Sequence, residues 1–246
     1  DVYKRQHEQS VADLTKQRTL ASVPFGGRYR MIDFPLSNMV NSDIDNVGII
    51  TKDNYLSLMD HLGSGDEWDL SRKTGGMHLL PPYGNSSALY RGRLEAMAQV
   101  KPFIESSNAE YVLLSDADVV ANIDYRPIID FHEKNNADCT IAVLEVPWEE
   151  ASRFGILATD ENNKIYEFAE KPAEPKSNKA SMGVYVFSWD KLRKYLIEDE
   201  SNPDSANDFG KNIIPNMLAD QQRMVAYPFE GYWKDVGTID SLWEAN

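Results

Sequence analysis

Four short apolar runs along the chain lead into small or acidic residues, a pattern typical of buried β-strands. They occupy residues 47–51, 111–116, 139–144 and 182–187. Segments whose apolar residues recur at helical spacing lie between several of them, at residues 54–62, 94–100 and 125–134. Because an alternation of strands and helices is typical of βαβ units, the pattern predicts an α/β protein with a mixed, mainly parallel sheet.

The segments between these runs predict loops and one hairpin. Glycine and proline recur between residues 63 and 85, which predicts a long surface excursion of the kind that often carries function. The polar residues 160–164 precede a strand-like stretch at 165–168, as in a hairpin, and residues 170–179 form a Pro- and Lys-rich loop.

The domain organisation follows from the absence of any internal repeat, low-complexity segment or linker. We therefore expect one domain over residues 7–246. Residues 1–6 share no pattern with the rest and are set aside as foreign to the protein. Both ends are expected to be truncated, so that the chain is a fragment.

The composition of the 246 residues, 42% hydrophobic and 26% charged, is that of an ordinary globular protein. A formal net charge of −14 argues against a duplex nucleic acid partner, because such binding depends on basic residues that neutralise phosphates. A small anionic ligand is compatible with this charge, since Arg28 with Arg30 and Arg91 with Arg93 could form a positive pocket.

Cys139 is the only cysteine, which excludes a disulfide framework and a cysteine-based zinc site. It lies within an apolar run, so we expect a buried strand residue. No apolar run approaches the roughly 18 residues of a membrane span, and no signal peptide opens the chain. We therefore expect a cytoplasmic protein without membrane contact. Its histidines, at positions 7, 61, 78 and 132, show no metal-ligand spacing and are expected on the surface or on helix faces.

Two aspartates stand where ligands of open α/β sheets collect. Asp116 and Asp118 follow the apolar run 111–114, at the expected carboxyl end of a parallel strand, and carboxylates there suit Mg²⁺. Asp235 lies in an aromatic segment with a glycine turn, residues 231–240, and could share one magnesium ion with Asp118. The alternatives are acids that merely end a strand, and a turn aspartate beside an aromatic core patch.

Two further segments could bind phosphate. Residues 168–172, FAEKP, place Lys171 after an extended segment, where its ammonium could act as a point charge on a phosphate; a solvated loop is the alternative. Residues 23–38 contain a glycine pair and two arginines that could bind oxyanions, or simply a turn that leads into a helix.

Several motifs in order along residues 13–246 resemble the ADP-glucose pyrophosphorylase family, which makes ADP-glucose and pyrophosphate from ATP and glucose 1-phosphate. The matching segments are residues 14–16, 23–34, 36–42, 90–92, 168–172, 181–187, 208–211 and 232–238. The resemblance implies a Rossmann-like, GT-A-like nucleotidyltransferase domain. In the family this domain precedes a left-handed parallel β-helix, which we expect to be missing from this chain.

The same resemblance implies the roles of individual residues. Asp118 and Asp235 would hold Mg²⁺, and Lys171 would hold the sugar phosphate with Glu170 and Ser181. Asp118, Asp235 and Lys171 would thus be the catalytic set. Two further substrate contacts are implied at Tyr90 and Gly155.

The chain departs from the family pattern where the nucleotide binds. The glycine-rich loop that wraps the triphosphate has no counterpart in residues 7–15, and Leu20 stands where the family has a phosphate-binding lysine. The adenine pocket is altered at residues 79–85 and 92–96, and the family's Gly-Asp-His becomes Ala117-Asp118-Val119.

These departures resemble the regulatory second subunit that some bacteria pair with a catalytic one. We therefore expect a subunit with little activity of its own, assembled with a catalytic adenylyltransferase subunit as a heterotetramer. It should bind glucose 1-phosphate, and it should bind ATP poorly. One alternative is an active glucose-1-phosphate adenylyltransferase. Another is a nucleotidyltransferase for a different sugar phosphate.

Overall fold

The computed structural model describes residues 11–82, 90 and 92–246. Its contacts divide the chain into two compact units, each assembled from segments that are far apart in the sequence. Unit 1 combines residues 1–91, 116–125 and 231–246, and unit 2 combines residues 92–115 and 126–230. The single domain over residues 7–246 stays a prediction, and His7 lies outside the described residues.

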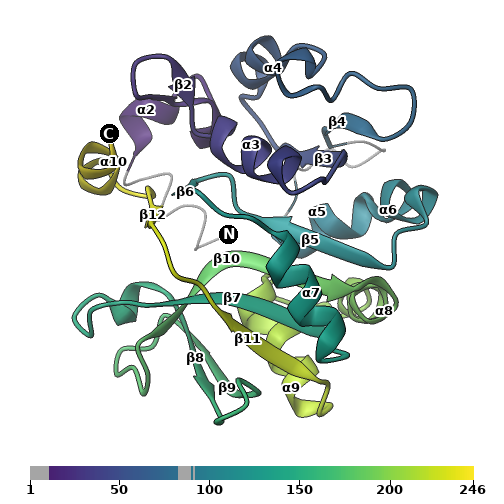
Figure 1. The fold of residues 1–246 in the computed structure, drawn as a ribbon, viewed down its shortest axis with the longest axis vertical. Coiled ribbons are helices and arrows are strands. Elements are labelled where there is room, and N and C mark those ends of the chain that lie inside the picture. The colour runs from purple at the N-terminus through teal and green to yellow at the C-terminus, as the bar shows by residue number, and fades with distance from the viewer. Residues whose placement is uncertain (1–10, 83–89, 91) are drawn as a thin grey trace. The chain divides into compact units, whose positions relative to one another are not determined.

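Unit 1 consists of short helices and three two-stranded sheets (Figure 1). Strands β3 and β4 are parallel, whereas β1 with β2 and β6 with β12 are antiparallel. Its elements are α2 (Ala12–Thr15), η1 (Leu20–Ser22), β1 (Pro24–Phe25), β2 (Tyr29–Arg30), α3 (Asp33–Asn41), β3 (Asn46–Ile50), α4 (Leu56–Leu62), η2 (Asp66–Trp68), β4 (Gly76–Leu80), β6 (Val119–Ala121), β12 (Trp233–Asp235) and α10 (Ile239–Ala245).

Two apolar clusters hold unit 1 together. The first joins the start of α3 to β3 and α4, through residues such as Leu36, Ile49 and Leu58. The second joins the N-terminal turns to β6, β12 and α10, with Met31, Val120 and Val236 among its members. Burial of these side chains stabilises an arrangement in which α10 packs on residues between 20 and 34.

Helix α3 also supplies hydrogen bonds to the segment that contains β6. The Asn38 amide donates to the carbonyl of Ala121 over 3.0 Å, and its oxygen accepts from the N–H of Ile123 over 3.4 Å. The Ser42 hydroxyl accepts from the N–H of Tyr125 over 2.8 Å. These buried side chains satisfy backbone groups that the short strand β6 leaves without a ladder partner.

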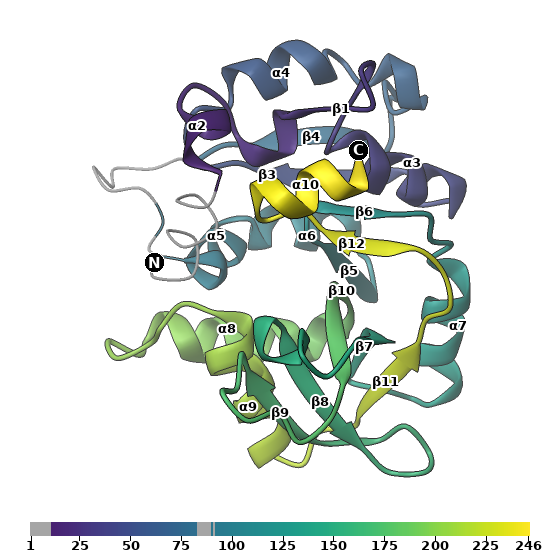
Figure 2. The same ribbon diagram turned by 90° about the vertical axis from the view of Figure 1, so that its left-hand side faces the viewer.

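Unit 2 is built on one six-stranded sheet. Figure 2 shows α7 on one face of this sheet and α8 on the other. Its elements are α5 (Arg93–Gln99), α6 (Lys101–Ser107), β5 (Tyr111–Ser115), α7 (Arg126–Lys134), β7 (Cys139–Glu145), η3 (Ala151–Arg153), β8 (Gly155–Thr159), β9 (Ile165–Glu170), β10 (Lys179–Ser188), α8 (Trp189–Glu200), the π-helical turn η4 (Phe209–Ile213), α9 (Ile214–Ala219) and β11 (Met224–Pro228).

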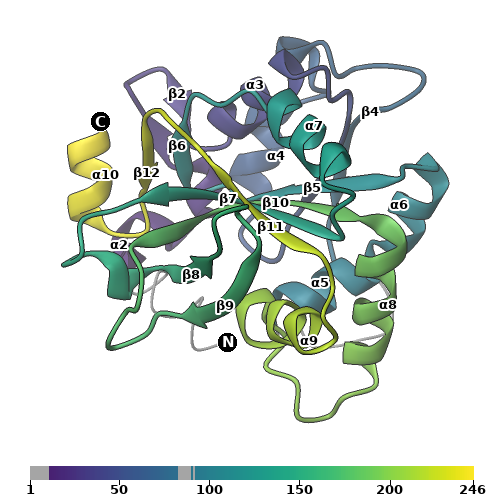
Figure 3. The same ribbon diagram turned by 60° about the horizontal axis from the view of Figure 1, so that its bottom comes forward.

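Strand β10 is the centre of this sheet, whose order is β11-β7-β10-β8-β9 (Figure 3). Its first residues pair with β7 and β8, and its last residues pair with β7 and β5. A β-bulge separates the two halves, between Ser181 and Tyr185. At the outer strands, a bridge between Lys164 and Val225 joins the start of β9 to β11. Beside this bridge, the N–H of Ala226 donates to the carbonyl of Asn163 over 2.8 Å.

The predicted strands and helices are found at their expected places, and the mixed α/β sheet is confirmed. The expectation of a mainly parallel sheet is wrong for the described strands, since only β11 with β7 and β3 with β4 are parallel pairs. An apolar run shows that a strand is buried but not the direction in which it enters the sheet. The hairpin at residues 160–164 is confirmed as the turn between antiparallel strands β8 and β9.

The predicted surface excursion at residues 63–85 is wrong for residues 76–80, which form β4. A Cβ atom on Gly75 would lie 2.9 Å from the carbonyl oxygen of Asp45, and one on Gly76 would lie 2.6 Å from that of Leu70. These glycines allow backbones to approach closely at the start of a strand. Residues 83–85 of the predicted excursion lie outside the described residues.

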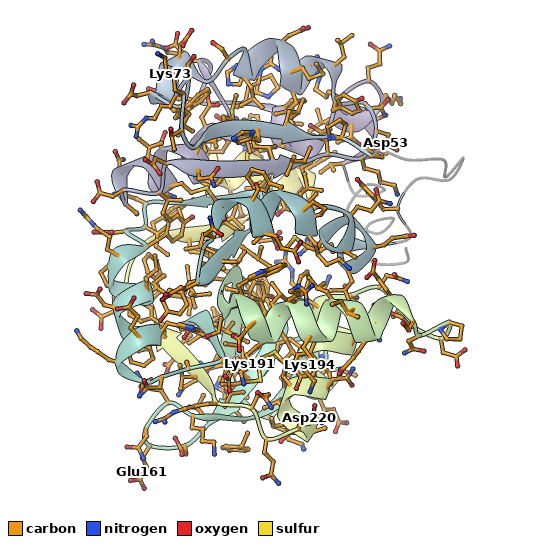
Figure 4. All side chains as sticks on the ribbon, turned by 90° about the vertical axis from the view of Figure 1, so that its right-hand side faces the viewer. Asp53, Lys73, Glu161, Lys191, Lys194 and Asp220 are labelled. Atoms are coloured by element: carbon orange, nitrogen blue, oxygen red, sulfur yellow. The ribbon has the colours of Figure 1, made fainter. Side chains whose placement is uncertain are left out.

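Unit 2 has a surface network of ion pairs along α8 (Figure 4). Lys194 lies 3.6 Å from Asp220, which also accepts a 2.8 Å hydrogen bond from the buried Tyr195 hydroxyl. Lys191 lies 3.7 Å from Asp138. Exposed pairs of this kind each contribute little to stability. No helix among the described residues has both the length and the apolar character of a membrane span.

His132 and Cys139 are buried at the contact between α7 and the sheet. Cys139 is confirmed as a buried strand residue, and burial raises the pKa of its thiol well above the usual value. The hydroxyl of Ser188 donates to the carbonyl of Ala137 over 2.9 Å, so it accepts from Nε2–H of His132 over 3.1 Å. Burial lowers the pKa of His132 to about 4, which favours the neutral ring. In that ring Nδ1 accepts from the Thr140 hydroxyl over 2.8 Å.

Acid should destabilise the protein through His132. The unfolded chain, in which this pKa is near 6.5, binds more protons than the folded chain between pH 4 and 6.5. The stability that depends on neutral His132 is therefore fully present above pH 6.5 and is lost towards pH 4, by about 3 kcal/mol in total. In urea unfolding at pH 7 and pH 4.5, His132→Gln should lose less stability than the wild type. Equal losses would contradict the assignment.

Candidate active site

Asp118 and Asp235, the two carboxylates predicted to share a metal ion, lie on adjacent backbone segments of unit 1. Asp235 of β12 is paired with Val119 of β6, and the N–H of Val236 donates to the carbonyl of Asp118 over 3.0 Å. Val236 is fully buried in the second apolar cluster and anchors this pairing. The fold thus brings together two backbone positions from opposite halves of the sequence.

The Asp235 carboxylate is fixed by its own turn. Its Oδ1 accepts from the N–H of Gly237 over 2.8 Å, and a capping box between Thr238 and Ser241 then begins α10. Among the residues the structure describes, no three His, Cys, Asp or Glu side chains gather into a metal site. Since Mg²⁺ often takes only one or two carboxylates together with phosphate oxygens and waters, a carboxylate pair is a donor set that fits it.

The start of unit 1 shows what replaces the expected phosphate-binding lysine. Leu20 opens η1 and packs against the second apolar cluster, beside Val23 and Met31. Arg30 uses its Nη1 to donate to the carbonyl and the hydroxyl of Ser57 in α4. That nitrogen is therefore engaged within the protein. Of the residues expected at the place of the glycine loop, 7–10 lie outside the described part of the chain, and 12–15 form the short helix α2.

Three of the predicted sugar phosphate residues form adjoining positions in unit 2. Gly155 of β8 is paired with Glu170, the last residue of β9. Lys171 follows with a φ angle of 49°, a left-handed conformation that residues other than glycine rarely adopt. A 3.1 Å hydrogen bond from its N–H to the carbonyl of Phe154 holds it there. Backbone strain of this kind is concentrated at functional positions.

Ser181 extends this row across the sheet. It lies at the β10 bulge, one residue beyond Ala180, which is paired with Ile156 of β8. That register brings Ser181 beside Gly155. Its hydroxyl donates to the hydroxyl of Tyr185 over 3.1 Å, and only 8% of the residue is exposed. Gly155, Glu170 and Ser181 therefore occupy one transverse row, with Lys171 at its end.

The structure adds two neighbours of this row to which the sequence assigned no role. The Tyr185 ring stacks on that of Phe209 in η4, with centroids 6.3 Å apart. Gly210, the next residue of η4, lies against the Glu170 carboxylate, because a Cβ atom there would be 2.6 Å from Oε2. Residues 208–211 are part of the sequence resemblance, but nothing in their order along the chain shows that they reach Glu170.

Tyr90, the remaining predicted substrate contact, belongs to unit 1 rather than unit 2. Only 4% of it is exposed. The structure therefore assembles Gly155, Glu170, Lys171 and Ser181 within one unit and leaves the role of Tyr90 as a prediction.

Comparisons with known proteins show the family to which the chain belongs. A family model described as nucleotidyl transferase matches residues 10–246. Glucose-1-phosphate adenylyltransferases of Clostridium beijerinckii and Geobacillus stearothermophilus are each 54% identical to this chain over 235 residues, which are 95% of this chain. The chain spans 61% of the length of these curated relatives.

A solved structure supports the fold. It is described as a glucose-1-phosphate thymidylyltransferase of Bacillus anthracis in complex with a sucrose, and it matches with a TM-score of 0.78. The match covers 98% of this chain and 90% of that one at 23% identity, which shows the fold alone. The chain belongs to the nucleotidyl transferase family, and the two curated relatives named above are glucose-1-phosphate adenylyltransferases.

Proposed function

We propose that this chain is the nucleotidyltransferase part of a regulatory-type subunit of glucose-1-phosphate adenylyltransferase, cytoplasmic and with little turnover of its own. One contrast carries the proposal. The row that contains Glu170 and Ser181 is assembled in unit 2, whereas Leu20 packs in an apolar cluster where a cation would have to meet the triphosphate. The subunit would thus bind the sugar phosphate better than the nucleotide.

The sugar phosphate row has groups that suit both ends of glucose 1-phosphate. The ammonium of Lys171 can neutralise a phosphate oxygen as a flexible point charge. A carboxylate repels phosphate but accepts hydrogen bonds from hydroxyl groups, so Glu170 suits the sugar ring. The Ser181 hydroxyl can both donate and accept. Together these groups would orient glucose 1-phosphate for in-line attack by its phosphate oxygen on the α-phosphorus of ATP.

The metal ion would belong to unit 1. Asp118 and Asp235 would hold Mg²⁺, which when bound neutralises the charge that develops on the phosphates. The residues themselves would bind and orient, because Asp235 ends β12 and Asp118 immediately precedes β6, the strand that pairs with β12. This part of the machinery is present in the chain although the lysine at position 20 is not.

The partner that this arrangement requires is a catalytic adenylyltransferase subunit, assembled with this chain in a heterotetramer. The catalytic subunit would bind the triphosphate, and the present subunit would modulate the catalytic subunit in response to a sugar phosphate or an anionic effector. Coupling between the two subunits would then mean that the affinity of the catalytic subunit for its substrates changes when the present subunit binds its ligand.

An active glucose-1-phosphate adenylyltransferase is the second candidate. It is favoured by the names of the relatives at 54% identity and by the presence of both aspartates. It would need a triphosphate grip that does not depend on a cation at position 20.

Turnover should separate these candidates. With ATP, glucose 1-phosphate and Mg²⁺, the full-length protein alone should release little pyrophosphate, because the triphosphate lacks its cation. Mixed with a catalytic subunit, it should raise the rate above that of the catalytic subunit alone. Pyrophosphate release is the measurement, and Asp118→Asn is the control. Rapid release by the protein alone that Asp118→Asn abolishes would establish the active enzyme instead.

Lys171 should decide the affinity for the sugar phosphate. Loss of a charge-assisted hydrogen bond to phosphate weakens binding about tenfold or more, so Lys171→Ala should raise the dissociation constant of glucose 1-phosphate by that factor in calorimetry. Lys176→Ala is the matched control in the same loop, since Lys176 is exposed and lies 2.6 Å from Glu167. Equal affinities of the two variants would contradict the role of Lys171.

A further inference from the structure

The Glu170 carboxylate lies against two glycines from different parts of unit 2. A Cβ atom on Gly155, its partner across the β8–β9 ladder, would lie 3.0 Å from Oε2. One on Gly210 would lie only 2.6 Å from Oε2 and 3.2 Å from Cδ. Both distances are shorter than ordinary contacts of a methyl group, so the observed position of the carboxylate depends on the absence of a side chain at both residues.

Backbone conformation does not require glycine at either position. Neither Gly155 nor Gly210 has a φ angle in the left-handed region. A larger residue is therefore excluded only by what its side chain would meet. At Gly155 this is chiefly the Phe168 ring, 2.7 Å from a Cβ atom, which a packed strand holds in place. At Gly210 the closest obstacle is the carboxylate itself, the movable end of a flexible side chain, and the Phe168 ring lies farther away, 3.2 Å from a Cβ atom.

The backbone around Gly210 is firmly held. It belongs to a single π-helical turn, a conformation that is rare and frequently found at functional sites. The Asp208 carboxylate accepts from the N–H of Lys211 over 3.1 Å, and the Asp208 carbonyl accepts from the N–H of Asn212 over 2.9 Å. Ile213 is fully buried at the end of the turn. An added methyl group at Gly210 would therefore displace the carboxylate rather than the turn.

We propose that Gly210 is a positioning residue, which acts through Glu170: its bare α-carbon lets the carboxylate take the place from which it accepts hydrogen bonds from the hydroxyls of the sugar phosphate. The inference rests on the proposed function of the row. It further states that the selectivity of this row for the sugar is set by the π-helical turn, whose Gly210 lies 40 positions after Glu170 in the sequence.

The test is a binding cycle on the full-length protein, with glucose 1-phosphate and inorganic phosphate as probes in calorimetry. Gly210→Ala should weaken glucose 1-phosphate binding about tenfold, the effect of one lost hydrogen bond to a charged group. Binding of inorganic phosphate, which has no sugar hydroxyls, should not change. The melting temperature should be nearly unchanged, because alanine is favoured over glycine within a helix. Lys211→Ala, an exposed change in the same turn, is the control and should bind both probes as the wild type does.

The second arm repeats the change in a protein without the carboxylate. In a Glu170→Ala background, Gly210→Ala should have no further effect on glucose 1-phosphate binding. An equal loss in both backgrounds, or no loss in the wild-type background, would overturn the positioning role. Failure of the wild-type protein itself to bind glucose 1-phosphate would instead refute the proposed function on which this role rests.

Discussion

The arrangement of unit 2 depends on the way β10 changes partners along its length. Along one edge it pairs with β7 in both halves, and along the other edge it pairs first with β8 and then with β5. The ladder with β7 shifts register in a bulge between Ser181 and Tyr185, and bulges are a common means of redirecting side chains beside functional sites. Because Ser181 lies at the bulge itself, the constraint that shapes the sheet also places a hydroxyl beside Gly155.

The other members of the row follow from this placement. Register with β8 fixes Gly155, register of β8 with β9 fixes Glu170, and the left-handed turn that ends β9 fixes Lys171. The π-helical turn then packs Gly210 against the carboxylate. The proposed sugar phosphate site is held by backbone hydrogen bonds, so it can persist when residues elsewhere are exchanged. Leu20 shows such an exchange, since an apolar side chain has joined a core cluster at the position of an expected cation.

Much of the fold could be predicted from the sequence because buried strands appear in it as runs of apolar residues. The runs around Val47, Leu113 and Ile141 are strands as predicted, and Cys139 is buried as predicted. Strand direction could not be predicted, because an apolar run is the same whether it pairs in parallel or antiparallel. The strand at residues 76–80 was hidden by glycines that permit close packing but also occur in loops.

The candidate site likewise contains residues that the sequence indicates and residues that it does not. Its charged members, such as Asp118, Asp235 and Lys171, stand out in the sequence because their chemistry is explicit. Gly210 and Tyr185 do not, because their importance lies in what they touch, and contacts between distant segments depend on sheet register and on an irregular turn. The resemblance to a family supplied the roles of Gly155 and Ser181, which spacing alone would not have indicated.

The central claim is that the sugar phosphate side of the site is intact while the triphosphate side is impaired. Parallel calorimetric titrations of the wild-type protein with glucose 1-phosphate and with Mg-ATP test it directly. The account predicts saturable binding of glucose 1-phosphate. Because position 20 lacks a cation, Mg-ATP should bind about tenfold or more weakly than glucose 1-phosphate. Mg-ATP binding as tight as that of glucose 1-phosphate, or no binding of glucose 1-phosphate, would contradict it.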